Sequence, residues 1–243
     1  MILNCRVPVY FFISILFFNT LYAQDSISPP TSSSNAIAFY NKFIGEDAHL
    51  YNGSEHALYD FRIKGFPYFE SNVLQVGFVN YDSILYQQIN MAYDIVRDEL
   101  TINRYNQNFR MTLVNDKIAY FSLLNHYFVR IIQDSLNRAT ITTGFYDRLY
   151  NGKLKLFAKR QKKIIETVTA EEGDKLWFEE SDSYFILRNN IYFSIKDKNN
   201  LFDFFKDRKK DLKKYLRKNK IKFKDGPETA ILKAIEYYDK LKN

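Results

Sequence analysis

The segment GFYDRLYNGKLKLFAKR, residues 144–160, contains the clearest hairpin signal of the chain. Two runs rich in aromatic and aliphatic residues flank the dipeptide Asn151-Gly152. Asn-Gly supplies the two positive-φ residues of a type I′ turn, whose twist matches that of two antiparallel strands. The segment therefore predicts a β-hairpin with its turn at residues 151–152.

Similar runs of β-branched and aromatic residues, separated by Asn, Asp, Ser and Gly, extend from about residue 70 to residue 196. Short strands at this spacing predict an antiparallel meander. Arg188-Asn189-Asn190, between SYFIL and IYFSI, is a second and weaker hairpin signal. About eleven to thirteen strands must curl or close, because a long flat edge would aggregate. A curved sheet, a half-barrel, a barrel-like sheet and a two-layer sandwich all remain open.

Helical periodicity returns near the end of the chain, over residues 199–242. Asn199 or Asn200 can cap the first of two or three helices, and Pro227 suits the first turn of the last. A short amphipathic helix is also expected over residues 35–44. We therefore expect one α+β domain at residues 35–243, in which a short N-terminal helix precedes the meander and the C-terminal helices follow it.

The first 23 residues have the layout of a secretory signal peptide. Arg6 precedes an apolar run of about a dozen residues, shorter than the roughly 20 that span a bilayer, and Ala23 suits the peptidase. The Ser- and Pro-rich residues 24–34 read as a flexible spacer. Cleavage would remove Cys5, the only cysteine, and leave no transmembrane span. We expect an exported protein that is periplasmic, outer-membrane associated or extracellular.

Cations are concentrated in KDRKKDLKKYLRKNKIKFK, residues 206–224. This segment has eleven Lys or Arg and two Asp, a net charge of +9, whereas the whole chain has +7. The charge is therefore local, which favours either a solvated helix face or a docking face for anionic lipid or an acidic envelope protein. The docking residues expected in the second case are Arg208, Lys209, Lys210, Lys213, Lys214, Arg217 and Lys218.

A nucleic-acid partner is not expected. The basic segment is mainly Lys, and its Tyr215 and Phe223 fall where a core-facing stripe is needed, so they are not free to stack on bases. Export would also remove such a partner. The 22 Phe and 19 Tyr of the chain fit an ordinary core, and they equally fit an apolar cavity for acyl chains.

Catalytic motifs are scarce. The sequence contains no GxSxG, GxGxxG or HExxH pattern. His49 and His56 lie near Glu55 and Asp60, but their seven-residue spacing is a poor match to metal motifs. We therefore assign no catalytic residue, no metal site and no cofactor. Recurring Tyr-Asp pairs are interpreted as strand ends, where Tyr packs and Asp begins the turn.

A carboxylate pair assembled by the fold is the alternative chemistry, and it would make the protein a hydrolase. The candidates are Asp94, Asp98, Asp82 and Asp147. Asp94 and Asp98 on one strand would lie about 13 Å apart, farther than glycoside hydrolysis uses.

The motifs YNGSEH, YDFRIKGFPYF, VGFVNYDSILYQQINMAYDIVRDEL, GFYDRLYNGKLKLFAKRQK and ILKAIEYYDKL resemble a group of exported proteins common in Bacteroidota. The resemblance covers most of the mature chain and implies an exported location, but it carries no activity and no site residue. The expected function is that of a non-catalytic envelope protein that binds a lipid, a peptide or a partner protein.

Overall fold

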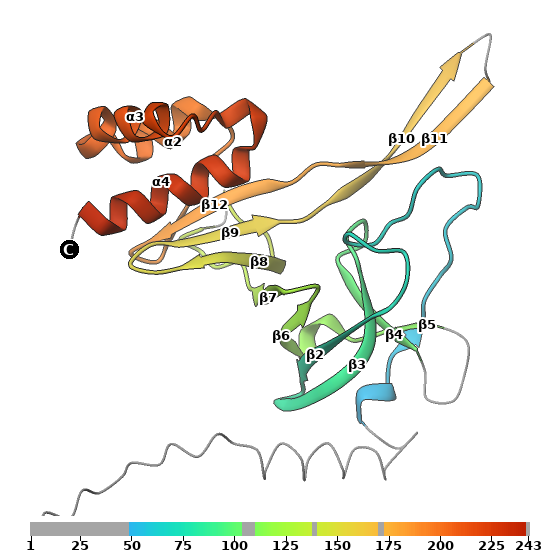
Figure 1. Ribbon diagram of the computed structural model, residues 1–243. Coiled ribbons are helices and arrows are strands. Elements are labelled where there is room, and N and C mark those ends of the chain that lie inside the picture. The colour runs from blue at the N-terminus through green and yellow to red at the C-terminus, as the bar shows by residue number, and fades with distance from the viewer. Residues whose placement is uncertain (1–48, 104–109, 138–139, 170–172, 242–243) are drawn as a thin grey trace, which may run out of the picture.

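The computed structural model describes residues 49–103, 110–137, 140–169 and 173–241 (Figure 1). The expected signal peptide, the spacer and the helix at residues 35–44 lie outside the described residues. The remainder is mainly β, with one large antiparallel sheet and three C-terminal α-helices. The predicted large antiparallel sheet and the C-terminal helices are therefore confirmed.

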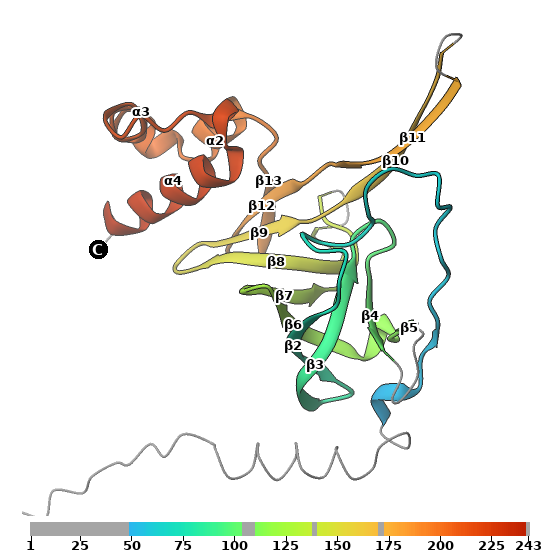
Figure 2. The ribbon, with the colours of Figure 1, turned by 45° about the vertical axis from the view of Figure 1, so that its right-hand side comes forward.

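The large sheet has eleven strands in the order β1-β5-β4-β3-β2-β6-β7-β8-β9-β12-β13. Among the described residues β1 and β13 form its two edges, so the sheet is not closed into a barrel. The strand direction turns between β3 and β8 (Figure 2). Its strands are β1 (Ser54–Glu55), β2 (Gln75–Tyr81), β3 (Ile84–Asp94), β4 (Glu99–Asn103), β5 (Arg110–Thr112), β6 (Ile118–Leu123), β7 (His126–Ile131), β8 (Gly144–Asn151), β9 (Lys155–Lys159), β12 (Ser183–Arg188) and β13 (Ile191–Ser194).

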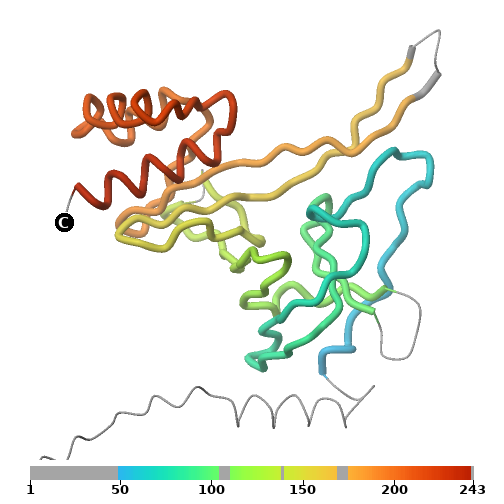
Figure 3. Tube along the Cα trace, viewed as in Figure 1, coloured from blue at the N-terminus to red at the C-terminus, as the bar shows by residue number. Residues whose placement is uncertain are grey.

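The hairpin at residues 144–160 is confirmed, but its predicted turn is wrong. Neither Asn151 nor Gly152 has a positive φ, and three residues separate Asn151 from its cross-strand partner Lys155. Glycine at position 152 has another explanation than a positive φ. A Cβ at residue 152 would lie 2.6 Å from Asp239 Oδ2, in the last helix. Glycine thus leaves room for the Asp239 carboxylate, and the last helix ends beside the β8–β9 turn (Figure 3).

Type I′-like geometry occurs at three other tight turns. Both residues have positive φ at Asp82-Ser83, at Leu124-Asn125 and at Asn189-Asn190. In each case the residue before the pair and the residue after it are cross-strand partners. The weaker hairpin signal at Asn189-Asn190 is therefore confirmed. Leu124 is an unfavourable residue for this backbone region, and its side chain packs against the core.

The sequence led us to expect strands β10 (Lys162–Thr169) and β11 (Gly173–Glu180) in the large sheet. They do not join it. They form a separate two-stranded ribbon that projects from the body (Figure 1). The backbone of Lys64 anchors the ribbon, because its N–H donates to Leu176 O at 2.9 Å and its carbonyl accepts from Phe178 N at 3.1 Å. The cross-strand pair Lys163–Glu179, in which both side chains are exposed, suits a solvated ribbon, whereas Lys162 is buried where the ribbon joins the body.

The helices are α2 (Lys198–Phe204), α3 (Lys209–Lys218) and α4 (Pro227–Leu241), with short 3₁₀ turns at His49–Tyr51, Asn115–Lys117, Lys206–Arg208 and Phe223–Asp225. Asp197, and not Asn199 or Asn200, caps α2, since its carboxylate accepts from both of those backbone N–H groups. As predicted, α4 begins at Pro227. None of the described helices combines the length and hydrophobicity that a bilayer crossing requires.

Three hydrophobic clusters hold the molecule together. The first lies within the curved part of the sheet, where the rings of Tyr93, Phe121 and Phe128 pack at centroid distances of 4.7–5.2 Å. The second fills the space between the sheet and the three helices and includes Phe205 and Tyr238. The third is smaller and contains Tyr146 and Phe157. The helices are therefore docked on the sheet by burial of an apolar stripe.

Candidate functional site

Helix α3 is held by its apolar face and presents its cations to solvent. Leu212 and Leu216 are buried in the second hydrophobic cluster, where α3 packs against α2 and α4, and Tyr215 stacks on Tyr237 of α4 with ring centroids 4.1 Å apart. The three- and four-residue spacing of these side chains leaves the other side of the helix to lysine and arginine. The sequence pattern therefore predicted this orientation correctly.

The seven predicted docking residues divide into two groups. Arg208 lies 3.7 Å from Asp211, and Lys209 lies 3.0 Å from Asp203. The other five, which are exposed and have no carboxylate partner among the described residues, are Lys210, Lys213, Lys214, Arg217 and Lys218. Five uncompensated cations on one short element create a strong local positive field.

A pocket of about 340 Å³ opens between α2, α3 and the segment that precedes α4. Apolar side chains form much of its wall, including Leu201, Leu216 and Phe223. Four exposed cations belong to the same pocket: Lys198, Lys213, Arg217 and Lys222. The pocket therefore combines an apolar interior with a cationic rim.

Two of these cations flank the same aromatic ring. The ammonium nitrogens of Lys198 and Lys213 lie 5.7 Å and 5.3 Å from the centroid of Phe202. Lys222 has only an exposed ion pair with Asp225, at 3.6 Å, which is worth little in water. An incoming anion would consequently meet cations whose charge is not neutralised by buried carboxylates.

Sequence reasoning identified only part of this site. Lys213 and Arg217 belong to the predicted set and line the pocket, whereas Arg208, Lys209, Lys210, Lys214 and Lys218 do not. Lys198 was missed because it belongs to α2, and no local pattern shows that α2 packs beside α3. Lys222 lies within the basic segment but was not singled out. The apolar wall could not be foreseen, since its residues come from separate elements.

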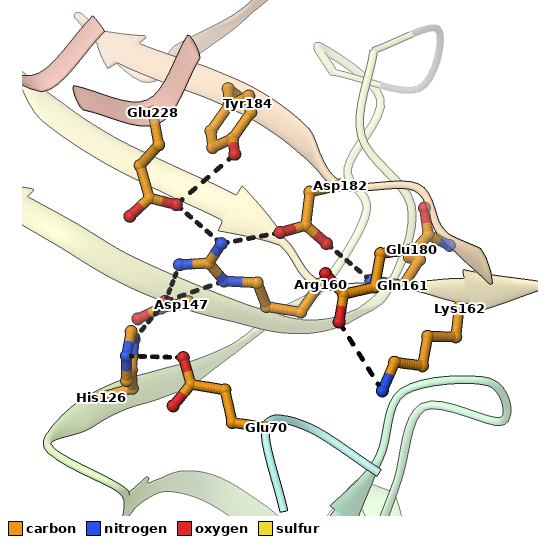
Figure 4. Close-up of polar contacts among 10 residues, drawn as sticks. All are labelled: Glu70, His126, Asp147, Arg160, Gln161, Lys162, Glu180, Asp182, Tyr184 and Glu228. Carbon is orange, nitrogen blue, oxygen red and sulfur yellow. Dashed lines mark hydrogen bonds and ion pairs between the residues drawn. The ribbon is translucent and has the colours of Figure 1, made fainter. Parts of the chain in front are cut away.

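A partly buried polar cluster, here called the Arg160 cluster, lies at the junction of the sheet and α4 (Figure 4). It comprises Glu70, His126, Asp147, Arg160, Asp182 and Glu228. Arg160 is only 7% exposed. Its guanidinium donates to Asp147 at 2.6 Å and to both Asp182 and Glu228 at 2.7 Å. Although burial opposes its charge, the bonds to these carboxylates raise the pKa of Arg160.

His126 completes the Arg160 cluster. Its Nδ1 lies 2.7 Å from Asp147 Oδ2, and its Nε2 lies 3.6 Å from Glu70 Oε1. The hydrogen bond to Asp147 raises the pKa of His126, and this effect outweighs desolvation. The interpretation of Asp147 as a strand end is wrong, because it is buried in the middle of β8. A charge inside an apolar strand requires a buried partner, and Arg160 is that partner.

The other candidate carboxylates are also occupied by partners. Asp82 is on an exposed turn, 3.4 Å from Lys117. Asp94 is fully buried and accepts from the Tyr59 hydroxyl at 2.8 Å. Asp98 accepts from Lys159 Nζ at 2.6 Å and from Tyr93. Asp94 ends β3 whereas Asp98 lies in the turn that follows, so the two carboxylates do not share a strand.

His56 lies in a second closed network. It is 4% exposed, its Nδ1 lies 3.0 Å from Thr112 Oγ1, and its Nε2 lies 3.6 Å from Asp94 Oδ2. Burial lowers the pKa of His56, which favours the neutral ring. The described pockets are lined neither by His56 nor by any of the four candidate carboxylates. These three pockets therefore do not place a substrate beside the candidate carboxylates.

Comparison with models of protein families, with curated proteins and with solved structures finds no match. The function must therefore be argued from the geometry of the site.

Proposed function

We propose that this protein is a non-catalytic exported protein of the cell envelope, and that it docks through α3 and the adjoining pocket onto an anionic amphiphile such as an acidic lipid. The observation that carries the proposal is the pocket with an apolar wall and four cations at its rim. An amphiphile with a phosphate or carboxylate head matches both parts of the pocket. The exported location is supported by the signal-peptide pattern of residues 1–23.

Electrostatic attraction would bring α3 to a membrane surface. Each Lys or Arg near an anionic leaflet contributes about 1 kcal/mol, so the five unpaired cations of α3 can dominate the association. The apolar wall would then take the hydrocarbon next to one headgroup, and long Lys side chains would keep their ammonium groups at the polar boundary. The proposal thus gives separate roles to the helix surface and to the pocket.

Co-sedimentation with vesicles tests the surface role. The protein should bind vesicles containing phosphatidylglycerol and should not bind vesicles of phosphatidylcholine alone. A variant with Lys210, Lys213, Lys214, Arg217 and Lys218 changed to Gln should bind at least about 100-fold more weakly at low salt. The matched control removes five exposed cations elsewhere: Lys64, Lys117, Lys155, Lys163 and Lys240. Equal binding by the two variants would contradict the proposal.

Calorimetry with small ligands tests the pocket. Dodecyl phosphate should bind with a measurable heat, whereas inorganic phosphate, which lacks the hydrocarbon, should not. Phe223→Ala removes part of the apolar wall and keeps every charge, so it should weaken dodecyl phosphate binding without reducing adsorption to anionic vesicles. If both phosphates bind equally well, the pocket is not a site for an amphiphile.

A carboxylate-pair hydrolase is the alternative function. It requires a cleft in which two of the candidate carboxylates face one substrate. Among the described residues each of them is instead held by its own donors. The site geometry consequently favours the binding protein.

A further inference from the structure

The last strand of the sheet, β13, has one side open. Within the described ranges it pairs only with β12, and it is the final strand in the sheet order. Ile195 N donates to Tyr184 O at 2.9 Å, so the backbone N–H and C=O groups of Ile195 and Phe193 point toward β12. By the two-residue alternation of a strand, the N–H and C=O groups of Tyr192 and Ser194 point to the open side.

One half of this edge is already covered. Asn137 imitates a neighbouring strand, since its Oδ1 accepts from Tyr192 N at 2.9 Å and its Nδ2 donates to Asn190 O at 3.1 Å. No corresponding cover lies over the outward backbone of Ser194 in the described ranges of the chain. The outward N–H and C=O groups of Ser194 can therefore still form hydrogen bonds with an added strand.

The open half lies in the largest described pocket, a groove of about 660 Å³. Because the strand alternates, the groove reaches both faces of the sheet edge. Phe185 and Tyr192 line it on one face, whereas Phe193 and Phe204 line it on the other. Phe204 belongs to α2, next to β13 (Figure 2). The groove thus provides apolar contacts for side chains that point alternately up and down.

The groove is lined by positive charges, which favour an acidic ligand. Arg188, Lys196 and Lys206 line it, and the guanidinium of Arg188 lies 4.2 Å from the ring centroid of Phe204. The only carboxylate in the lining is Asp203, which pairs with Lys209 at 3.0 Å. An occupant with negative charge is therefore favoured over a neutral or basic one.

We propose that this groove binds a short, extended, acidic peptide segment of a partner protein, which adds a strand to the open half of β13. The backbone of the segment would pair with Ser194, its apolar side chains would contact the phenylalanines, and its carboxylates would face Lys196 and Lys206. Strand addition of this kind obtains affinity from main-chain bonds and specificity from the pockets on either face. The site is separate from the cationic pocket beside α3.

Fluorescence anisotropy tests the proposal with a labelled hexapeptide in which valine alternates with aspartate or glutamate, both ends being blocked. Ser194→Pro removes the outward N–H without removing a bond to β12, so binding should weaken at least about tenfold. Ser194→Ala keeps the N–H and is the matched control. Lys196→Gln combined with Lys206→Gln should weaken binding several-fold at low salt, and a lysine-containing version of the peptide should not bind.

Amide hydrogen exchange provides an independent readout, because peptide binding should protect the Ser194 N–H in the wild-type protein. The proposal is overturned if the acidic peptide does not bind, if Ser194→Pro binds as tightly as Ser194→Ala, or if the Ser194 amide stays unprotected. The α3 variant with five glutamines should bind the peptide normally, whereas Ser194→Pro should bind anionic vesicles normally. Peptide binding that is lost with the α3 variant would place the peptide at α3 and overturn this assignment.

Discussion

Arg160 is the residue on which separate parts of the chain converge. Its three carboxylate partners come from β8, from the segment before β12 and from the first turn of α4. Charges removed from water in this way are tolerated only while they are paired. The residue therefore couples the sheet to the helical layer through electrostatics as well as packing.

Replacing Arg160 with Met should destabilise the protein by about 3–5 kcal/mol, because Asp147 would remain buried with His126 alone as its partner and would lose both guanidinium hydrogen bonds. Urea unfolding followed by circular dichroism measures the free energy. Arg62→Met is the control, since Arg62 pairs with Asp60 on the surface, where the side chain is 69% exposed and the expected loss is below about 1 kcal/mol. Similar losses for the two variants would refute the assigned role of Arg160.

His126 should make stability depend on pH. The pKa of His126 is raised in the folded state, so its contribution is complete below the unfolded pKa, about 6.5, and is lost as pH rises through the folded pKa. His126→Gln should therefore cost about 1–3 kcal/mol near pH 5.5 and clearly less near pH 9. Urea unfolding at both pH values measures the difference, with His49→Gln at an exposed position as the control. A loss that is equal at the two pH values would contradict the prediction.

At the level of elements, tight turns set the register of the meander. Asp82-Ser83, Leu124-Asn125 and Asn189-Asn190 each reverse the chain within two residues of positive φ. Only the last of these has a composition that local rules recognise easily. Asn151-Gly152 has the favoured composition, but neither residue has a positive φ, and Gly152 lies against Asp239 of α4. Turn chemistry thus predicts hairpins better than it predicts turn types.

Ser83→Gly should stabilise the protein by about 0.5–1 kcal/mol, because glycine adopts positive φ without the steric penalty that serine has at φ 66°. Thermal and urea unfolding measure the change. The matched control is Ser122→Gly, which lies inside β6, where glycine should destabilise by about 0.5–1 kcal/mol. The two substitutions should therefore have opposite signs, and the same sign in both would disprove the explanation.

Across the whole molecule, the sequence predicted the architecture better than the sites. Strand periodicity and the amphipathic pattern of the C-terminal helices were sufficient for the meander and the helical layer. The separate β10–β11 ribbon was not predicted, although its strands carry more charged residues than strands such as β2 and β6. The Arg160 cluster and the cationic pocket join residues far apart in the chain, such as Arg160 with Glu228 and Lys198 with Lys222. Such partnerships depend on tertiary packing, which local patterns do not contain.

The mature protein should begin at Gln24. The expected leader ends at Ala23, so expression of the full chain in a host that exports it should yield a protein shortened by 23 residues. Intact mass spectrometry of the envelope fraction measures this difference. An Ala23→Arg variant, which blocks recognition by the peptidase, should retain the leader. A full-length wild-type protein in the cytosol would exclude the proposed location.

The β10–β11 ribbon behaves as an insertion between β9 and β12. These two strands pair directly with each other, and Ser181 N donates to Gln161 O at 2.9 Å, so the main sheet is continuous at the base of the ribbon. The entropy lost on loop closure grows only with the logarithm of loop length, about 0.6 kcal/mol for each doubling. Lengthening the ribbon beyond the part that Lys64 contacts should therefore leave the body folded, and this makes the ribbon a suitable place to graft a foreign epitope.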